Sequence, residues 1–383
     1  MGRLKVGIAG RRGSAFVAGL RAHPDAELTA LCEIDPAALE RQGREFEVDL
    51  LFADYEQMLD SVDAVVVATP MHLHATQAIL ALRAGKHVLS EVTAAVTLDE
   101  CWRLLDAVRE STATYMLSEN YCYMADNILV RELVREGLFG EIYFGEGEYL
   151  HEVRDMHHFP DGRPTWRSFW QVGVNGSTYP THSLGPVMQW FTALDPQERV
   201  DRVICVGSGI HTEPEHPHDD TTLLLCTLAS GKLVKVRLDM MSNRPHLPAF
   251  YSVQGTRGVY EGARQSGQRG IVWVGESEAG GKRQWRPISD FDDRMPRERR
   301  EMTEAARKAG HGGGDYFVVK DFVDAALGRT PPAIDIYTAL EWTAAGLCSQ
   351  VSLANRGAAI SVPNFRDRSK RPLTLDLPPP AWP

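Results

Sequence analysis

Residues 4–14 read LKVGIAGRRGS, and this stretch decides the fold of the first domain. An apolar run at Leu4–Ala9 leads through Gly10 and Gly13 into a helical pattern near Ser14–His23. A strand, a glycine turn and a helix in this order start a βαβ unit, in which backbone amides at the helix N-terminus can bind a pyrophosphate. The stretch therefore predicts a dinucleotide-binding domain.

The same alternation of strands and helices continues to residue 117. Its strands are short and almost wholly apolar, as strands buried on both faces of a parallel sheet are. We therefore expect an α/β Rossmann domain with a doubly wound parallel sheet over residues 1–122. Further strands are predicted at Glu27–Cys32, Leu50–Phe52, Ala64–Ala68, Val88–Leu89 and Tyr115–Leu117, and helices at Pro36–Phe46, Thr76–Ala84 and Leu98–Ser111.

After Tyr123 the strands become longer and many of them alternate, which is typical of an antiparallel sheet. The Ser230-Gly231 step predicts a hairpin between two of these strands. We expect residues 123–383 to form an α+β domain with a large, mostly antiparallel open sheet. Strands are predicted at Glu141–Leu150, Arg202–Ser208, Thr221–Leu228, Leu233–Met240, Phe250–Gln254 and Gly270–Val274, helices at Ile128–Glu136, Tyr316–Ala326 and Tyr337–Asn355, a low-complexity loop at Gly275–Gly281, and a Pro-rich terminus.

The composition excludes several classes of partner. The chain has 383 residues, too many for one core of ordinary size, and a formal net charge of −10. Such a chain offers no extended basic surface for nucleic acid and no polybasic membrane anchor. Its six cysteines lie apart without a C-x-x-C pair, which disfavours a disulfide framework or a zinc site. With no membrane-spanning apolar run and no signal peptide, we expect a cytoplasmic protein with a small-molecule partner and no metal.

The glycine turn departs from the usual dinucleotide fingerprint. Gly7, Gly10 and Gly13 can let backbone amides approach a pyrophosphate, but Arg11 and Arg12 separate the last two glycines. The usual pattern is G-x-G-x-x-G starting at the turn, so the motif alone is weak. A second residue is needed to support it.

That second residue is Glu33, which lies 23 residues after Gly10 at the end of the second predicted strand. A carboxylate at this position can accept both hydroxyls of the adenosine ribose, which favours NAD. Arg11 or Arg12 can instead reach a 2′-phosphate, so NADP remains the alternative cofactor.

Several further stretches resemble one enzyme family. Residues 65–70 (VVVATP), His74, residues 85–89 (GKHVL), Glu91 and residues 137–142 (GLFGEI) resemble the Gfo/Idh/MocA family. The resemblance implies a Rossmann domain, a second domain that binds substrate and whose sheet often mediates oligomers, and NAD(P)-dependent chemistry on sugars or polyols. A homo-oligomer, dimer or tetramer, is therefore expected. The cofactor contacts that the resemblance implies are Thr69, Pro70, His74 and Glu91.

The sequence departs from this family where catalysis is expected. The family has Glu-Lys-Pro there, and this chain has Glu91-Val92-Thr93. A lysine ammonium can donate to a developing alkoxide and carry a proton, whereas valine can do neither. The usual dehydrogenase acid is missing.

A second resemblance fits this departure. Glu91-Val92, Glu119–Tyr121, residues 179–186 (YPTHSLGP) and residues 311–315 (HGGGD) resemble the NAD-dependent glycoside hydrolases, of which the α-N-acetylgalactosaminidases are the type case. In that branch the bound cofactor oxidises a ring carbinol, a neighbouring C–H proton is lost, the glycosidic oxygen leaves, and the hydride returns. The functional positions that carry over are Glu91, Tyr121, Tyr179 and His182. Thr93 replaces the branch's usual proline.

The residue types themselves support Tyr121, Tyr179 and His182 as the catalytic candidates. Tyr179 and His182 are three residues apart, a spacing that places both on one face of a helix beginning near Pro180. Imidazole, with a pKa of about 6.5, is a natural base for a hydroxyl proton. Tyr121 follows the last Rossmann strand, at the edge where α/β folds bind ligands. To act as a base it needs its pKa lowered by a nearby cation or the oxidised nicotinamide.

Three residues are candidates for substrate contacts. His311 lies in a glycine-rich loop before a predicted helix, and the glycines can let it approach substrate. Asp315 in the same loop can bind substrate or cap that helix. Trp166 can stack on a sugar face, although Trp166 and Trp170 at a spacing of four can also be packing residues.

Three functions remain open. The first is a dehydrogenase that removes hydride from a secondary alcohol of a sugar and releases NADH. The second is a glycoside hydrolase in which the hydride returns and NAD does not dissociate. The third is an inactive NAD(P)-sensing protein, which the altered triplet at Glu91 fits but the retained Tyr121, Tyr179 and His182 do not.

Overall fold

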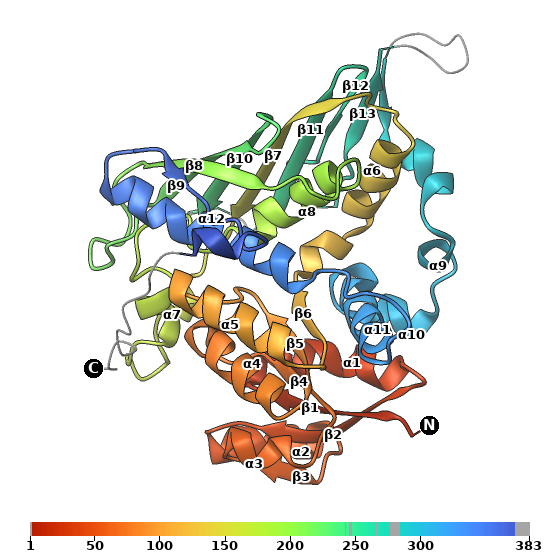
Figure 1. The fold of residues 1–383 in the computed structure, drawn as a ribbon, viewed down its shortest axis with the longest axis vertical. Helices are drawn as coiled ribbons and strands as arrows, with labels where there is room; N and C mark the ends of the chain where they lie inside the picture. Colours follow the sequence, from red (N-terminus) through yellow and green to blue (C-terminus); the bar gives the residue numbers. More distant parts are fainter. Residues whose placement is uncertain (1, 242, 245–246, 266, 276–283, 372–383) are drawn as a thin grey trace.

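The chain forms two β-sheets that follow one another along the long axis of the molecule (Figure 1). The computed structural model describes residues 2–241, 243–244, 247–265, 267–275 and 284–371. Most of the predicted low-complexity loop and nearly all of the Pro-rich terminus lie outside the described residues.

The first sheet has six parallel strands in the order β3-β2-β1-β4-β5-β6. The order reverses between β1 and β4, which is the switch point where doubly wound sheets bind ligands at their carboxyl ends. The predicted α/β Rossmann fold is confirmed. Its strands are β1 (Leu4–Ala9), β2 (Ala26–Cys32), β3 (Leu50–Phe52), β4 (Ala64–Val67), β5 (His87–Glu91) and β6 (Tyr115–Ser118), with helices α1 (Ser14–Ala22), α2 (Pro36–Glu45), α3 (Tyr55–Leu59), α4 (His74–Arg83) and α5 (Leu98–Glu110), and 3-10 turns η1 (Arg11–Gly13) and η2 (Met71–Leu73).

Local sequence explains where these helices begin. Asp35 accepts a hydrogen bond from the amide of Ala37 and precedes Pro36, a residue suited to a first helical position. Thr97 and Glu100 form a reciprocal capping box at the start of α5. The short helix α3 was not predicted, although Asp54 caps it through the amide of Gln57.

The second sheet has nine strands in the order β14-β13-β12-β11-β7-β10-β9-β8-β15. Its neighbours pair antiparallel except β7 and β10, so the predicted mostly antiparallel sheet is confirmed. Gly231 has φ +86°, which suits the predicted hairpin turn. The strands are β7 (Ile142–Leu150), β8 (Val200–Gly207), β9 (Thr221–Leu228), β10 (Leu233–Asp239), β11 (Leu247–Gly255), β12 (Gly258–Glu261), β13 (Ile271–Val274), β14 (Trp285–Pro287) and β15 (Ile360–Ser361).

The helices of the second half lie beside this sheet and between the two sheets (Figure 1). Gly147 in β7 lets α8 pack closely, because a Cβ there would lie 2.1 Å from the carbonyl oxygen of Ser183. These helices are α6 (Ala125–Arg135), α7 (Trp166–Trp170), α8 (Thr181–Thr192), α9 (Arg297–Arg300), α10 (Glu304–Lys308), α11 (Gly314–Ala326) and α12 (Ile336–Ala354), with 3-10 turns η3 (Asn120–Tyr123), η4 (Arg154–Met156), η5 (Ile288–Arg294), η6 (His311–Gly313) and η7 (Arg368–Lys370).

The end of the first sheet is joined directly to the second half of the chain. The amide of Leu117 in β6 donates to the carbonyl of Ile334, and η3 follows within two residues of the end of β6. The turn η3 contacts both α8 and α11. The carboxyl edge of the Rossmann sheet therefore faces side chains from the second sheet and its helices. The domain boundary after residue 122 stays a prediction.

Candidate active site

The glycine turn after β1 is shaped for close backbone approach. Gly10 has φ +92°, and a Cβ there would lie 2.4 Å from the carbonyl oxygen of Ala68. A Cβ at Gly13 would lie 2.2 Å from the side chain of Ile8. Neither η1 nor α1 has a side-chain cap. The amides of Gly13 and Ser14 donate to carbonyls within the turn, so the amides of Arg11 and Arg12 are the ones that can bind an anion. This arrangement fits the pyrophosphate of a dinucleotide.

Glu33 directly follows β2, at the carboxyl edge of the sheet. Its Oε1 accepts hydrogen bonds from the amides of Ile34 and Asp35, at 2.8 and 3.2 Å. These contacts orient the carboxylate, whose second oxygen can then accept from a ribose. A Cβ at Gly7 would meet the side chains of Met58 and Val62 in the core, so packing alone favours a glycine there. The contact of Gly7 to the cofactor stays a prediction.

Arg12 lies near three groups of the predicted catalytic region. Desolvation by burial lowers the pKa of Arg12, but the nearby Glu91, Tyr179 and Asp315 outweigh it, so that the pKa is raised. The contact of Arg11 or Arg12 to a 2′-phosphate stays a prediction.

His74 has a supporting position. It is 1% exposed, and its Nδ1 and Nε2 lie 2.8 Å from the carbonyl oxygens of Thr93 and Thr69. Burial lowers its pKa, and the two carbonyls oppose this effect. A neutral imidazole has one N–H, so His74 donates to one of these two carbonyls, and its position between them places it between the loop at Thr69-Pro70 and the triplet at Glu91-Val92-Thr93. The contact of His74 to the cofactor stays a prediction.

The three predicted catalytic residues come together at one place. The rings of Tyr121 and His182 are stacked, with centroids 4.1 Å apart and planes 13° apart. The ring of Tyr179 meets His182 edge-on at 5.0 Å. Tyr179 and His182 were predicted to meet on one face of a helix. In the structure α8 begins at Thr181, so Tyr179 precedes the helix. The meeting of the rings therefore depends on the turn before α8 and not on helical spacing.

Two further residues complete this group and were not predicted as site residues. Glu119 is fully buried; its Oε1 lies 2.7 Å from Nδ1 of His182 and accepts the amide of Tyr121. Tyr149, in β7, has its ring 4.9 Å from His182 and 5.8 Å from Tyr121. In the sequence, Glu119 lies two residues before Tyr121 in the stretch Glu119–Tyr121 that carries the second resemblance, but Tyr149 is indistinguishable from a core tyrosine of a strand. We call Glu119, Tyr121, Tyr149, Tyr179 and His182 the tyrosine–histidine cluster.

The electrostatics of this region depart from one expectation. Desolvation raises the pKa of Glu91 to about 7, against the opposing charges of Arg12 and His182. Burial also raises the pKa of Tyr121, and the neighbouring Tyr149 and Glu119 add to this effect. The chain alone therefore stabilises the neutral phenol of Tyr121, which is the opposite of the lowering that an independent base requires.

The predicted substrate residues have unequal support. Asp315 is 1% exposed and accepts a hydrogen bond from Asn120; it lies in the first turn of α11, whose N-cap is Gly313, so it is not the predicted cap. His311 begins η6, but its side chain lies outside the described part of the structure. The guanidinium of Arg167 covers one face of Trp166 at 4.6 Å, so at most the other face can meet a sugar.

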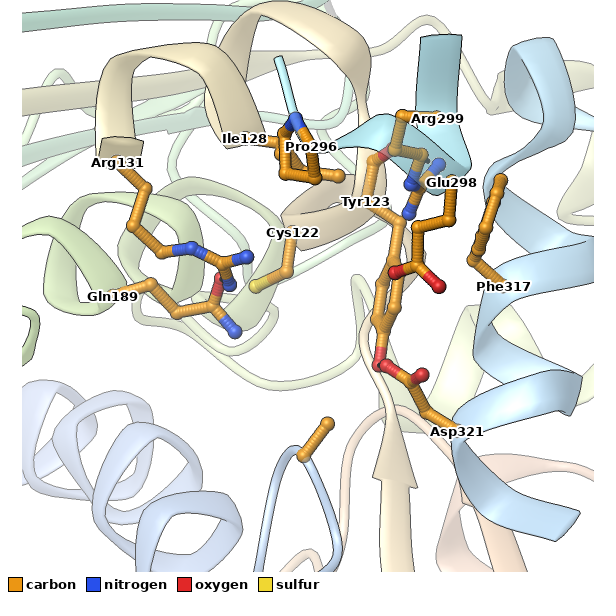
Figure 2. A pocket seen from close by; sticks show the side chains of 11 residues that line it. Cys122, Tyr123, Ile128, Arg131, Gln189, Pro296, Glu298, Arg299, Phe317 and Asp321 are labelled. Atoms are coloured by element: carbon orange, nitrogen blue, oxygen red, sulfur yellow. Dashed lines mark hydrogen bonds between the residues drawn. The ribbon is translucent and has the colours of Figure 1, made fainter. Parts of the chain in front are cut away.

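Two cavities lie away from the predicted site residues. A cavity of about 60 Å³ lies beside the residues that follow Tyr121, where the phenol of Tyr123 donates to Asp321 and Arg131 donates to Gln189 (Figure 2). A larger cavity of about 290 Å³ shares Arg131 and Gln189. The lining of both cavities contains none of the predicted site residues, as far as the structure describes them.

Among the described residues, no group of three or more His, Cys, Asp or Glu is arranged to hold a metal ion. No helix in the same part of the chain is long and apolar enough to cross a membrane.

The fold and glycine turn define an NAD-binding Rossmann protein of the Gfo/Idh/MocA oxidoreductase type. The model of that oxidoreductase family, with its NAD-binding Rossmann fold, matches residues 4–119. The C-terminal domain model of glycosyl hydrolase 109 matches residues 123–212 and 211–370. The chain belongs to glycosyl hydrolase family 109, and both predicted resemblances are confirmed.

Similar proteins agree with this assignment. A glycosyl hydrolase family 109 protein of Shewanella amazonensis is 30% identical, over 95% of this chain and 86% of the relative. An alpha-N-acetylgalactosaminidase of Shewanella oneidensis is 28% identical, over 93% and 83%. The solved levoglucosan dehydrogenase in complex with NADH has the same fold, with a TM-score of 0.78 and 21% identity over 94% of this chain and all of that one.

Proposed function

We propose that this protein hydrolyses glycosides at the tyrosine–histidine cluster, with NAD held by the adjoining glycine turn and Glu33. The observation that carries the proposal is the stacked pair of Tyr121 and His182 against the buried carboxylate of Glu119, in a site whose triplet lacks the family's lysine. A dehydrogenase on the same fold is the alternative. It would need another group to do the work of the missing lysine.

The residues that would hold the cofactor are the amides after Gly10, the carboxylate of Glu33 and, toward the nicotinamide, Glu91. A bound nicotinamide supplies removal and return of hydride at a carbinol carbon. The chain must handle the protons, and a route through elimination needs a base for a hydroxyl proton and a base for a C–H proton.

His182 is suited to the first of these proton transfers. With Nδ1 held by Glu119, Nε2 is the nitrogen that can take a hydroxyl proton, and the carboxylate stabilises the imidazolium that forms. Tyr121, stacked on the same imidazole, is suited to the second transfer. Tyr179 and Arg167 lie close enough to influence each other's charge, and both can hydrogen-bond a sugar hydroxyl.

A single assay separates the three functions. The purified protein is denatured to identify any bound dinucleotide, and the native protein is tested on nitrophenyl glycosides, beginning with α-N-acetylgalactosaminide, and on free sugars with added NAD. Aglycone release without net NADH is the expected result. Steady NADH production from a free sugar would support the dehydrogenase, and bound dinucleotide without any turnover would support the sensor.

The outer face of the second sheet supports the expected homo-oligomer. Ile204 and its register partner Leu225 are 38% exposed, and Val206 is 47% exposed on the same face. Apolar side chains gathered on one sheet face are typical of an interface. Light scattering should therefore give a dimer or tetramer, and Leu225→Lys should lower the assembly mass.

The six cysteines are free and buried, which fits the expected reducing, cytoplasmic location.

A further inference from the structure

A chain of three polar groups leads away from the tyrosine–histidine cluster. The phenol oxygen of Tyr149 lies 2.5 Å from Nδ1 of His151. The rings of Tyr121 and Tyr149 meet edge to face with centroids 5.8 Å apart, and Tyr149 is close enough to contribute to the raised pKa of Tyr121. Tyr121 and Tyr149 are each 5% exposed, whereas His151 is only half-buried. The chain therefore connects a buried phenol to an imidazole that meets solvent.

The direction in which these three groups can donate protons follows from the chemistry of a phenol. A phenol has one proton, so when Tyr149 donates to the imidazole, its oxygen can only accept from Tyr121. Tyr121 then donates to Tyr149, and Tyr149 donates to His151. If Nδ1 of His151 carries the proton instead, every donor in the chain is reversed.

Tyr121 needs such a chain because its surroundings oppose a phenolate. Burial raises the pKa of Tyr121, and burial likewise raises the pKa of Tyr149 in spite of the nearby guanidiniums of Arg167 and Arg12. A buried phenol can still accept a proton if it passes its own proton on at the same time. It then never carries a full negative charge.

We propose that Tyr149 and His151 form a proton relay that connects Tyr121 to solvent. This inference rests on the proposed function and adds the route of the C–H proton. The proton leaves the substrate carbon for the oxygen of Tyr121, the proton of Tyr121 moves to Tyr149, and the proton of Tyr149 moves to Nδ1 of His151. The electron pair of the C–H bond forms the new C=C bond as the glycosidic oxygen leaves. His151 then releases one proton from Nε2 to water.

The reversed chain serves the second half of the reaction. With Nδ1 of His151 protonated, the same three groups deliver one proton to the substrate carbon when water adds to the C=C bond. No oxidant or reductant is consumed by the relay, because one proton enters at one end as another leaves at the other. Tyr149 and His151 act through Tyr121 and are positioning residues.

The test uses Tyr149→Phe and His151→Ala in the full-length protein with its bound dinucleotide. Each change should lower kcat for aryl glycosides about 10- to 100-fold, less than the loss of a group that exchanges a proton with the substrate itself, because both groups act through Tyr121. Imidazole added to His151→Ala should restore turnover, and the solvent deuterium isotope effect should rise in that variant. Matched controls are Tyr143→Phe on the same strand, at an exposed tyrosine, and His211→Ala at an exposed histidine; both should retain wild-type kcat.

The outcomes separate the relay from the proposed function. Wild-type kcat in His151→Ala would overturn the relay, and so would a loss that imidazole does not restore with an unchanged isotope effect. The latter combination is what a purely structural role predicts. If the wild-type protein itself releases no aglycone, the proposed function fails and the relay fails with it.

Discussion

The two ends of the proposed cofactor site are built in different ways. The dinucleotide end uses backbone amides and one carboxylate from a single βαβ unit, with Gly10 and Glu33 only 23 residues apart. The reacting end uses side chains from η3, β7 and α8, with Glu119 and His182 63 residues apart. The first is a product of local sequence and the second of the complete fold. Changes at the two ends should therefore separate binding from chemistry.

The largest expected effect is at the reacting end. Tyr121→Phe and His182→Ala each remove a proton-transfer group, which is worth about 10²- to 10⁴-fold in rate. Because neither residue belongs to the glycine turn, the bound dinucleotide should be retained. We expect turnover to be abolished at normal dinucleotide content, measured by kcat and by cofactor release after denaturation. A wild-type rate in either variant would show that the role assigned to that residue is wrong.

The buried carboxylate should show a smaller effect. Glu119→Gln keeps the size of the side chain but removes the charge that orients His182 and stabilises its imidazolium. Because His182 itself remains in Glu119→Gln, we expect kcat to fall by about 100-fold, the lower end of the range for losing a proton-transfer group. Glu132→Gln, at a surface carboxylate that pairs with Arg135, is the control. An unchanged kcat in Glu119→Gln would remove the carboxylate from the mechanism.

The dinucleotide end should respond in stability and binding. Gly10→Ala places a Cβ 2.4 Å from a carbonyl oxygen at φ +92°, whereas Gly85→Ala, at φ +73°, meets open space. Gly85→Ala should cost about 1 kcal/mol of unfolding free energy for its positive φ alone. Gly10→Ala should cost clearly more and lose its dinucleotide. Equal unfolding free energies and equal cofactor content would contradict the close approach described at Gly10.

The smallest expected effect is a pH dependence at Glu91, where the two ends meet. Its pKa is raised to about 7, so the carboxyl is largely neutral below that pH and charged above it. A charged carboxylate accepts hydrogen bonds from ribose hydroxyls more strongly. The affinity of the cofactor-free protein for NAD should therefore rise as pH increases through about 7. Fluorescence titration should show this rise in the wild type and its loss in Glu91→Gln; the same rise in that variant would exclude Glu91.

Sequence reasoning succeeded where the structure depends on neighbours in the chain. The parallel sheet, the glycine turn and the position of Glu33 follow from patterns within one or two elements. It assigned Gly7 to the cofactor as part of the glycine turn and His74 through the family resemblance. It could not show which side chains pack against these residues, as Met58 does against Gly7, because such contacts depend on partners far away in sequence.

The reacting end was only partly predictable for the same reason. Tyr121, Tyr179 and His182 were found through motifs, but the motifs do not reveal which groups surround them. Tyr149 reaches the cluster because Gly147 lets α8 pack against β7, a contact between distant segments. The raised pKa of Tyr121 is likewise a property of burial in the assembled protein.

The central claim is that glycosides are cleaved by elimination at the tyrosine–histidine cluster, and turnover in D₂O tests it most directly. An aryl glycoside is incubated with the native protein in D₂O, and the sugar product is examined by mass spectrometry and NMR while NADH absorbance is followed. The account predicts one deuterium on the carbon next to the anomeric carbon, without net NADH. A product sugar that retains protium at that carbon would contradict it.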